Sequence, residues 1–451
     1  MSWPLELAPY KVQLEALRRA QEARGFGYWM DLGTGKTAVI LAEFTNLNRA
    51  ALVDDLVVVC PNSLKQNWQD EADKFGAKFG SVSLWPEDFP TAKPHLLVMN
   101  YEALSAEKGT LALQRHLKAS RVMLVLDESI HIKNPRARRT RHILALAPRA
   151  QYVRVLSGAP VTQGPHDLWA QVAAIGAAPM NFYAWREQFC KLGGYLGKQV
   201  MGVKDLDGLN RILDPCSFRA SKEDWLDLPK KIYTTRTVTM TADQQYHYDR
   251  MLRDFVTTVQ SKTVTAEMVV TQLTKLQQIS SNFIIDAAGT AHRISATNPK
   301  MEVVKEILES VSGKTLIFTY YRHSTETLAQ ELQAPYIWGG MDKVGISEMK
   351  RQFEQEPNIR VLVAQVHTAR YGHTLLGGEG PDRCATTIFY ENSYSLDART
   401  QSENRNHRIG QDRSVTYLDL IASRVDRAVI RALQRKNNVA TAILDHLKDQ
   451  S

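Results

Sequence analysis

The sequence predicts an α/β protein with two parallel-sheet domains in tandem and a helical insertion between them. Short apolar runs alternate with helical stretches in both halves of the chain, which is typical of strands buried on both faces of a parallel sheet. The 451 residues exceed the size of one typical domain core. We place the first domain at residues 1–225, with the insertion starting near 165, and the second at 226–451, with a helical segment to about 295.

The composition is that of an ordinary globular protein. Apolar residues make up 44% of the chain and charged residues 23%. The formal net charge of +8 allows nucleic-acid binding but does not establish it. The four cysteines form no Cys-x-x-Cys pair, so we expect neither a zinc site nor a disulfide framework. No apolar run approaches the roughly 20 residues of a membrane span, and no export signal is recognisable, so we expect a cytoplasmic protein without a membrane partner.

The first half opens with a predicted helix over residues 11–17, whose apolar residues lie mostly on one side. Gln13 in this helix has an amide that could donate to and accept from an adenine edge. A solvated helical glutamine is the alternative. A β-prone run over 27–30 follows, and residues 38–44 have helix-forming character.

The loop between that strand and that helix reads D-L-G-T-G-K-T and is typical of a phosphate-binding turn. Gly33 and Gly35 let the backbone aim N–H groups at one point, with Thr34 between them. Lys36 adds a positive charge, and Thr37 adds a hydroxyl suited to Mg²⁺. The start of the following helix also attracts phosphate. An ordinary glycine-rich turn with an exposed lysine remains the alternative.

An acidic pair, Asp127 and Glu128, ends one of the buried strands predicted next. These strands are expected at 56–60, 95–99, 122–126 and 152–156. Two carboxylates at the tip of a buried strand are costly unless a cation meets them. In an ATPase the first acid holds the magnesium and the second orients and deprotonates the attacking water. The alternative is an acidic pair that starts a helix.

The second half returns to strand–helix alternation after a mainly helical stretch. Helices are expected at 209–213, 243–259 and 300–308, and strands at 315–318, 336–338, 360–364, 387–390 and 415–421. Arg405 and Arg408 lie three residues apart between the last two strands and would share one face of a helix. Two guanidiniums there could stabilise charge on a transferring phosphoryl group. A solvated basic helix is the alternative.

These segments, in this order, resemble the Swi/Snf family of superfamily-two helicase-like ATPases over nearly the whole chain. Residues 401–411 match the family signature Q-x-E-x-R-x-H-R-I-G-Q position for position. Asp127 and Glu128, with Ile132-Lys133-Asn134, match its D-E-A-H-x-I-K-N segment. Further similarities are Gln13–Leu17, Pro61, Ser63-Leu64, Trp68, Asn100-Tyr101-Glu102, Ser157–Pro160 and the link from Phe218 to Lys230.

The resemblance implies two RecA-like lobes, each a parallel sheet, with ATP and Mg²⁺ bound in the cleft between them. The implied catalytic residues are Lys36, Asp127, Glu128, Gln401, Arg405 and Arg408. The implied nucleotide-binding residues are Gln13, Gly33, Thr34, Gly35, Lys36 and Thr37, and the implied metal ligands are Thr37 and Asp127.

The chain departs from the family pattern at two motifs. Ile130 stands where the family has histidine, and His131 follows one position later. Residues 365–375 resemble the motif V segment only in part, since Ala369 and Arg370 replace the usual glycine pair. No accessory domain is recognisable, so the chain is similar to the minimal motors of phages and bacteria, which implies a monomer.

The expected function is an ATP-dependent, DNA-stimulated translocase that hydrolyses ATP to ADP and phosphate while tracking on duplex DNA. One alternative is a true helicase that separates strands of DNA or RNA. A different class would be a non-catalytic scaffold that binds DNA or protein, and the retained Lys36, Asp127, Glu128, Arg405 and Arg408 argue against it.

Overall fold

The computed structural model describes residues 3–87, 92–193, 199–225, 228–261, 266–371, 375–378, 380–408 and 410–445. The chain divides into two compact units. Unit 1 holds the residues up to Asp227 together with the C-terminal segment from Lys436, and unit 2 holds Leu228–Arg435.

Unit 1 is built on a seven-stranded parallel sheet in the order β3-β4-β2-β5-β6-β1-β9. Its strands are β1 (Gly25–Met30), β2 (Asp55–Cys60), β3 (Ser81–Leu84), β4 (His95–Asn100), β5 (Val122–Leu126), β6 (Tyr152–Leu156) and β9 (Ser217–Ala220). Strands β2, β4, β5 and β6 are buried along almost their whole length. This burial on both faces confirms the prediction drawn from their apolar runs.

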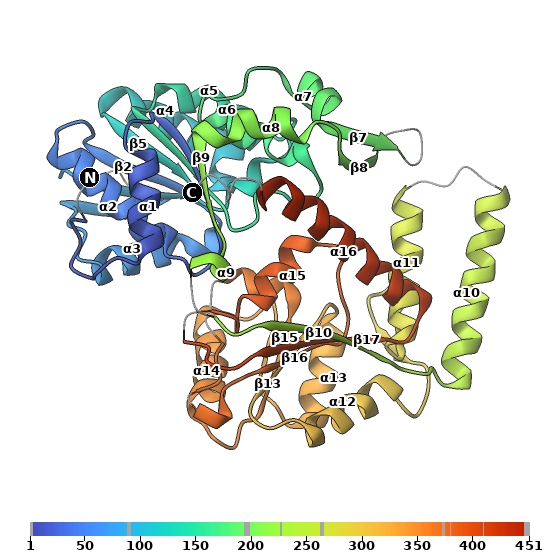
Figure 1. The fold of residues 1–451 in the computed structure, drawn as a ribbon. Helices are drawn as coiled ribbons and strands as arrows, with labels where there is room; N and C mark the ends of the chain where they lie inside the picture. The colour runs from blue at the N-terminus through green and yellow to red at the C-terminus, as the bar shows by residue number, and fades with distance from the viewer. Residues whose placement is uncertain are drawn as a thin grey trace. The chain divides into compact units, whose positions relative to one another are not determined.

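Helices cover both faces of this sheet (Figure 1). One face packs against α1 (Lys11–Ala20), α2 (Lys36–Arg49) and α3 (Lys65–Lys74). The other face packs against α4 (Glu107–Ala119), α5 (Arg138–Leu146) and α6 (Trp169–Ala174). Alternate residues of β2 enter the two cores, and β4, β5 and β6 likewise contribute to both layers.

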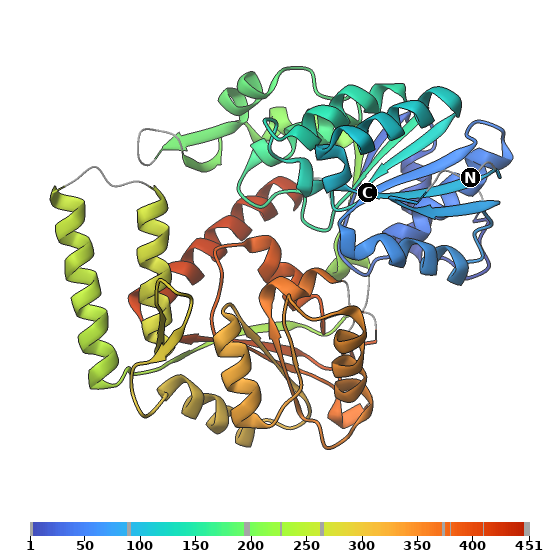
Figure 2. The same ribbon diagram turned by 180° about the vertical axis from the view of Figure 1, so that it is seen from behind.

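The stretch from 165 to 295 holds the expected helices and also several strands. Its remaining helices are α7 (Phe182–Phe189), α8 (Leu206–Leu213), α9 (Lys222–Trp225), α10 (Ala242–Ser261) and α11 (Ala266–Ser280). Two antiparallel hairpins lie here, β7 (Cys190–Gly193) with β8 (Gln199–Val203) and β11 (Phe283–Ile285) with β12 (Ala291–Arg293). Helices α10 and α11 pack side by side as a pair (Figures 1 and 2).

Unit 2 is built on a six-stranded parallel sheet in the order β10-β17-β16-β13-β15-β14. Its strands are β10 (Lys231–Thr237), β13 (Thr315–Thr319), β14 (Tyr336–Ile337), β15 (Val361–Gln365), β16 (Thr386–Phe389) and β17 (Val415–Ile421). The helices are α12 (Pro299–Ser310), α13 (Arg322–Leu332), α14 (Lys343–Gln355), α15 (Leu396–Glu403) and the first part of α16 (Arg424–Asp445), whose residues from Lys436 belong to unit 1. Helices α14 and α15 cover one face, and α12 and α13 the other. The two sheets confirm the predicted α/β class.

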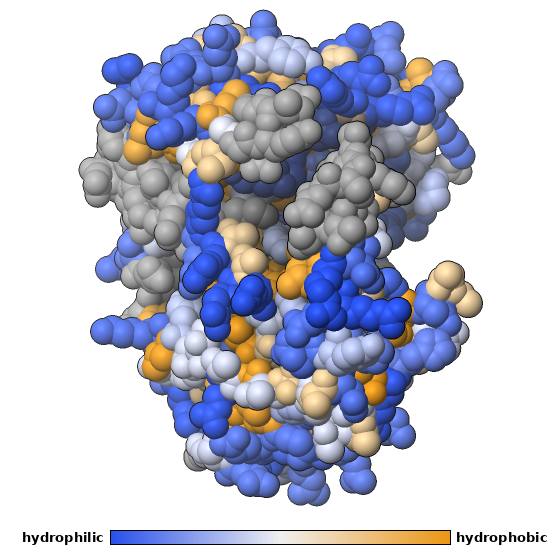
Figure 3. Space-filling view, turned by 90° about the vertical axis from the view of Figure 1, so that its right-hand side faces the viewer, coloured by the Kyte–Doolittle hydropathy of each residue, from blue (hydrophilic) through white to orange (hydrophobic). Residues whose placement is uncertain are grey.

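Short 3₁₀ turns join several of these elements. They are η1 (Asn62–Leu64), η2 (Tyr101–Ser105), η3 (Ser129–Ile132), η4 (Ala147–Arg149), η5 (Pro165–Asp167), η7 (Asp214–Cys216), η8 (Val366–Tyr371) and η9 (Gly380–Asp382). Within the described part of the chain, no helix has the length and apolar character that crossing a membrane requires. All four cysteines are buried free thiols. The surface drawn in Figure 3 is mainly hydrophilic, and the apolar residues on it form small separate groups.

Candidate functional site

The glycine loop of unit 1 connects the carboxyl end of β1 to the amino end of α2. Gly33 has a φ of 88° and Gly35 a φ of 85°, both in the left-handed region that favours glycine. The Thr34 hydroxyl donates to the Asp31 carbonyl at 2.7 Å and closes the turn. Gly35 is the N-cap of α2, so the first free N–H groups of a 14-residue helix follow directly. Thr37, the second residue of α2, is partly exposed.

Gln13 and Lys36 hold this loop from two sides. The Gln13 amide donates to the carbonyls of Thr34 and Gly35, each at 3.4 Å, and its oxygen accepts from the Tyr10 N–H at 2.8 Å. A Cβ at Gly35 would lie 2.0 Å from the Gln13 amide nitrogen, so a side chain here would displace the Gln13 amide from the loop. The Lys36 ammonium donates to the Met30 carbonyl at 2.7 Å and is buried.

Asp127 is a buried carboxylate at the carboxyl end of β5, held from several directions. Its Oδ2 accepts from the Trp68 indole N–H at 2.9 Å, and its Oδ1 accepts from the Glu128 N–H at 2.9 Å. The Tyr101 hydroxyl donates to the Asp127 carbonyl at 2.8 Å. Burial raises the pKa of Asp127, while the Lys36 charge and the two hydrogen bonds to the carboxylate oppose that rise. Loop and acid therefore belong to one electrostatic site.

Glu128 has a left-handed backbone, with φ 50° and ψ 53°. This conformation is rare for a residue other than glycine and costs of order 1 kcal/mol or more. The chain continues into η3, whose Ser129 hydroxyl donates to the buried Gln171 of α6 at 2.7 Å. Gln171 in turn donates to the Pro160 carbonyl at 2.9 Å. These hydrogen bonds of Ser129 and Gln171 fix the turn that follows Glu128 and so maintain its strained backbone conformation.

The position of the family histidine is filled by a core residue. Ile130 is 5% exposed and buried in unit 1. His131 instead stacks on Tyr101, with ring centroids 5.3 Å apart and planes 23° apart. The Tyr101 hydroxyl donates to the Asp127 carbonyl, so His131 contacts the acidic pair indirectly, through the Tyr101 side chain.

The turn after β6 touches the glycine loop. A Cβ at Gly158 would lie 3.0 Å from Leu32 Cγ and 3.2 Å from the Leu32 backbone nitrogen. The buried Ser157 hydroxyl accepts from the Ala159 N–H at 3.2 Å. Three loops, after β1, β5 and β6, thus meet at one edge of the parallel sheet, as ligand sites in such sheets require.

The arginine segment of unit 2 is not helical throughout, which corrects the expectation of a shared helix face. Helix α15 ends at Glu403, and residues 404–408 form turns and a bend. Arg405 is 6% exposed and donates from Nε to the Gln401 carbonyl at 2.9 Å, while Arg408 is partly exposed. Gln401 donates to Asp397 at 2.9 Å, and its buried Oε1 accepts no hydrogen bond from the described residues.

The other residues of this segment fix it to the sheet. Glu403 accepts from Arg399 at 2.8 Å, from Tyr233 at 2.7 Å and from Lys231 at 3.2 Å. Burial raises the pKa of Glu403, but the charges of Lys231 and Arg399 lower it by more than burial raises it. The pKa therefore lies below its ordinary value, and the carboxylate is ionised. His407 lies 2.8 Å from the Pro229 carbonyl. This anchoring positions the two remaining arginines.

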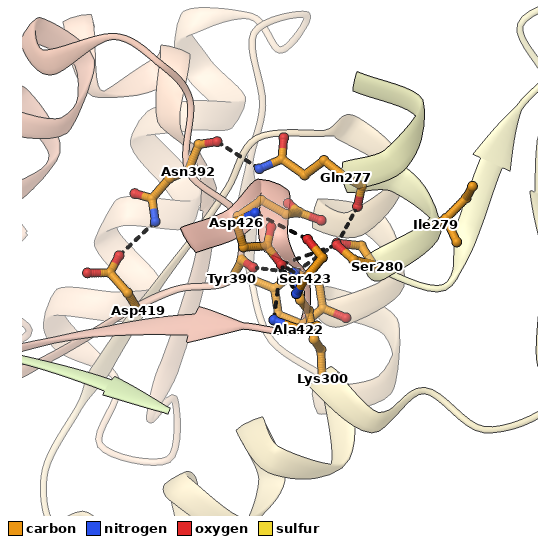
Figure 4. A network of polar contacts seen from close by, with 12 residues as sticks. Gln277, Ile279, Ser280, Lys300, Tyr390, Asn392, Asp419, Ala422, Ser423 and Asp426 are labelled. Atoms are coloured by element: carbon orange, nitrogen blue, oxygen red, sulfur yellow. Dashed lines mark hydrogen bonds and ion pairs between the residues drawn. The ribbon is translucent and has the colours of Figure 1, made fainter. Parts of the chain in front are cut away.

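A buried polar network extends from the segment to α11 (Figure 4). Arg399 pairs with Asp419 at 2.5 Å, and Asp419 accepts from the Asn392 amide at 2.7 Å. The Asn392 carbonyl accepts from Gln277 of α11 at 3.0 Å. A second part of the network centres on Asp426, which lies 3.4 Å from Lys300.

The structure brings the predicted residues together in two groups. The group in unit 1 consists of Gln13, Gly33, Thr34, Gly35, Lys36, Thr37, Asp127 and Glu128. The group in unit 2 consists of Gln401, Arg405 and Arg408. Ile409 of the arginine segment and 372–374 of the motif V segment lie outside the described residues.

Sequence reasoning did not find roles for three residues that hold the acidic pair. Trp68 and Tyr101 bond to Asp127 from 59 and 26 residues away, although both belong to segments that resemble family motifs. Gln171 was not singled out. Its signal was a single polar residue in the otherwise apolar stretch 168–175.

Comparison with known proteins identifies the family. The model of the SNF2-related domain family matches residues 29–283, more than half of the chain. The chain is 24% identical over 447 residues to the DNA annealing helicase and endonuclease ZRANB3 of Mus musculus, covering 93% of this chain and 39% of that protein. It is 23% identical over 456 residues to the uncharacterized ATP-dependent helicase MG018 of Mycoplasma genitalium, covering 96% of this chain and 42% of that protein. The chain thus spans about two fifths of the length of these relatives.

A similar solved structure is the Sulfolobus solfataricus SWI2/SNF2 ATPase core in complex with dsDNA. It has 20% sequence identity and a TM-score of 0.45, with 99% of this chain and 96% of that chain covered. The family match confirms the predicted resemblance. The chain belongs to the SNF2-related domain family, the Swi/Snf branch of the superfamily-two helicase-like ATPases.

Proposed function

We propose that this protein is an ATP-driven translocase that tracks on duplex DNA. The observation that carries the proposal is the joint site in unit 1, where the glycine loop and its buried lysine act on a buried carboxylate at the same sheet edge. A buried carboxylate next to a phosphate-binding loop is the arrangement that nucleotide hydrolysis needs. Membership of an ATPase family implies that ATP is the nucleotide.

The loop residues fit the phosphates of ATP. The left-handed glycines and the free N–H groups at the start of α2 offer several donors to one anion. Lys36 already lies at this point, bonded to the Met30 carbonyl. Nucleotide binding exchanges that bond for one to a phosphate oxygen. Gln13 then serves to hold the loop, since its amide bonds to the loop carbonyls.

Thr37 and Asp127 fit a magnesium ion that accompanies the nucleotide. Both supply oxygen ligands, which Mg²⁺ prefers, and the raised pKa of Asp127 marks a carboxylate that a cation would stabilise. Bound Mg²⁺ neutralises negative charge on the phosphates. The Trp68 bond holds Asp127 in one orientation for this purpose.

Glu128 is the base of the proposed reaction. The oxygen of a water molecule bonds to the γ-phosphorus, the bond from that phosphorus to the bridging oxygen of ADP breaks, and Glu128 takes the proton of the water. Glu128 follows β5 after one residue, and its left-handed backbone ends the extended course of that strand. Arg405 and Arg408 supply positive charge to the transferring phosphoryl group. A conformational change during each turnover then couples ATP hydrolysis to stepping along the DNA.

Duplex DNA is the proposed track. The curated relatives named as DNA annealing helicases support DNA as the substrate, and the net charge of +8 suits contacts to a phosphate backbone. A non-catalytic scaffold would have no need of the buried lysine, the strained glutamate and the anchored arginines together.

ATP hydrolysis by purified protein, with and without duplex DNA, tests the proposal. Lys36→Ala and Glu128→Gln should each lower turnover at least about 100-fold, while Lys74→Ala, which removes a lysine that is 58% exposed, should not. DNA should stimulate the wild type. Activity that persists in both site variants would refute the assignment of the site.

The role of the arginines has its own test. Arg408→Ala should keep ATP binding and lose turnover by about 1,000-fold or more, whereas Arg351→Ala removes an exposed arginine and should change neither. Loss of ATP binding in Arg408→Ala would contradict the proposed role. Displacement of a third strand from a triplex without unwinding of the duplex distinguishes translocation from strand separation. Efficient unwinding would favour the helicase alternative.

A further inference from the structure

The segment 133–141 concentrates positive charge directly after the acidic pair. It reads K-N-P-R-A-R-R-T-R and contains five cations and no acidic residue. The whole chain has a net charge of only +8. We call this stretch the basic segment. It comprises the turn after η3 and the first turn of α5.

Two of these five cations are tied to the protein and three are exposed. Lys133 donates to the Thr162 hydroxyl at 3.0 Å, and Arg139 donates to the His131 carbonyl at 3.0 Å; both are partly buried. Arg136, Arg138 and Arg141 are exposed. The Arg136 guanidinium donates to the Tyr183 hydroxyl at 3.1 Å, and the structure gives Arg138 and Arg141 no ion pair or hydrogen bond with any described side chain.

This arrangement is unfavourable for α5 taken alone. The first turn of the helix carries no acidic residue, and its N-terminus already bears positive partial charge. Arginines there repel the helix dipole and one another. An arrangement that costs local stability and leaves guanidiniums in solvent is explained if an anion binds to it. Three exposed cations spread along the surface suit a polyanion with one charge per about 1.7 Å of axis better than a single phosphate.

The basic segment also lies next to the proposed catalytic carboxylates. Arg139 holds the backbone of His131, whose ring stacks on Tyr101, and the Tyr101 hydroxyl bonds to the Asp127 carbonyl. Helix α5 packs against η2, the turn that begins with Tyr101. An anion on the basic segment would therefore lie a few contacts from the acidic pair.

We propose that the basic segment is a binding surface for the phosphate backbone of duplex DNA, with Arg136, Arg138 and Arg141 as its contact residues. The inference rests on the proposed function and names the part of unit 1 that meets the track. It places DNA contact on a segment that packs against η2, whose Tyr101 bonds to the Asp127 carbonyl, so the DNA-binding residues lie near the nucleotide site. Contacts of this kind are independent of base sequence.

The test is the salt dependence of DNA binding by the double variant Arg138→Gln/Arg141→Gln, measured by fluorescence anisotropy with a labelled duplex. Loss of two phosphate contacts should reduce the slope of log K against log salt by about 1.8. If a phosphate contact contributes nothing at 1 M salt, it contributes about eightfold to the affinity at 0.1 M, so the loss of two contacts should lower the affinity at 0.1 M about 60-fold. The DNA concentration for half-maximal ATPase stimulation should rise by the same factor.

The matched control is Arg115→Gln/Arg149→Gln. These two arginines are also exposed, but they lie in α4 and at the end of η4, just before strands β5 and β6 begin, and so at the opposite edge of the sheet. The control should keep the wild-type slope and affinity. An equal loss in both double variants would show that only overall charge matters and would overturn the proposal.

Further outcomes separate the possible failures. An unchanged slope in Arg138→Gln/Arg141→Gln, with wild-type protein that binds duplex DNA, would overturn this inference and leave the proposed function standing. Wild-type protein without DNA binding or stimulation would overturn both. A loss confined to single-stranded DNA would overturn the duplex assignment. The thermal unfolding midpoint of the variant should equal or exceed that of the wild type, because the substitution relieves charge repulsion in α5.

Discussion

The hydrogen bond from Trp68 to Asp127 makes a quantitative prediction about the pH dependence of catalysis. The indole donates to Oδ2 at 2.9 Å, and both groups are buried. Burial raises the pKa of Asp127, and this bond is one of the contacts that oppose the rise. Trp68→Phe removes the donor and keeps an aromatic ring. The pKa of Asp127 should therefore rise further above its ordinary value.

The size of the shift follows from the strength of the bond. A hydrogen bond to a charged group is worth about 1.5–3 kcal/mol, and one pKa unit corresponds to about 1.4 kcal/mol. Partial replacement of the indole by water reduces the loss, so we expect the lower end, about one pKa unit. The ionised carboxylate is the form that can bind a metal ion. Activity should thus fall with decreasing pH through the raised pKa, and the acid limb should lie about one pH unit higher in the variant.

The assay is kcat/KM for ATP as a function of pH, which reports groups of the free enzyme. Trp185→Phe is the matched control, because Trp185 is equally buried in unit 1 and its indole donates to the Pro165 carbonyl at 2.9 Å. The Trp185→Phe variant loses the same side-chain volume as Trp68→Phe, but the hydrogen bond that it loses goes to a neutral carbonyl and not to a carboxylate. Its acid limb should coincide with that of the wild type. A Trp68→Phe limb that does not move, or a Trp185→Phe limb that moves equally, would refute the reasoning.

Three further predictions concern the same unit. Gly35→Ala should weaken nucleotide binding at least about tenfold in a titration, because the added methyl group meets the Gln13 amide. The control is Gly176→Ala, where φ is 78° and a Cβ would have open space around it. It should bind the nucleotide normally and show only the backbone cost of about 1–2 kcal/mol in urea unfolding. Glu43→Gln should cost about 3–5 kcal/mol in urea unfolding, because it leaves the fully buried Arg154 without its 2.5 Å ion pair; a cost under about 1 kcal/mol, as for a surface pair, would contradict this. His131→Ala should lower DNA-stimulated turnover several-fold without loss of DNA affinity, and His131→Phe, which can keep the ring stacking, should restore it; equal turnover in both variants would exclude a role for the stacked ring.

Most of the strands that sequence patterns predicted lie in the interior of the sheets; the exception is β14, an edge strand that corresponds to the run expected at 336–338. Continuous apolar runs correspond to β2, β4, β5 and β6 within at most one residue at either end. Within the two parallel sheets, the strands that the patterns did not indicate are β3, β9 and β10, and each lies at the edge of its sheet. An edge strand pairs on one side only, and β10 is exposed along most of its length, so it needs no continuous apolar run.

In the candidate site too, local sequence patterns predicted some residues and missed others. Gly33, Gly35, Lys36 and the acidic pair were predicted because a phosphate-binding turn and a strand-end carboxylate are local patterns. The roles of Trp68 and Tyr101 were not, because their bonds to the acid span long stretches of chain.

The arginine segment illustrates how spacing alone can mislead. Residues three apart share a face only while the helix continues, and α15 ends at Glu403. Its end is held by Lys231 and Tyr233 of β10, 170 or more positions earlier in the chain. No local pattern carries that information.

The sequence by itself determined the α/β class, the interior strands, the glycine loop and the acidic pair, because each depends on residues close together in the chain. Only the tertiary structure decided which edge strands complete the sheets, where α15 stops, and which side chains surround Asp127. Those outcomes depend on burial and on hydrogen bonds between segments distant in sequence, whose free energies exist only once the sheet has brought the segments together.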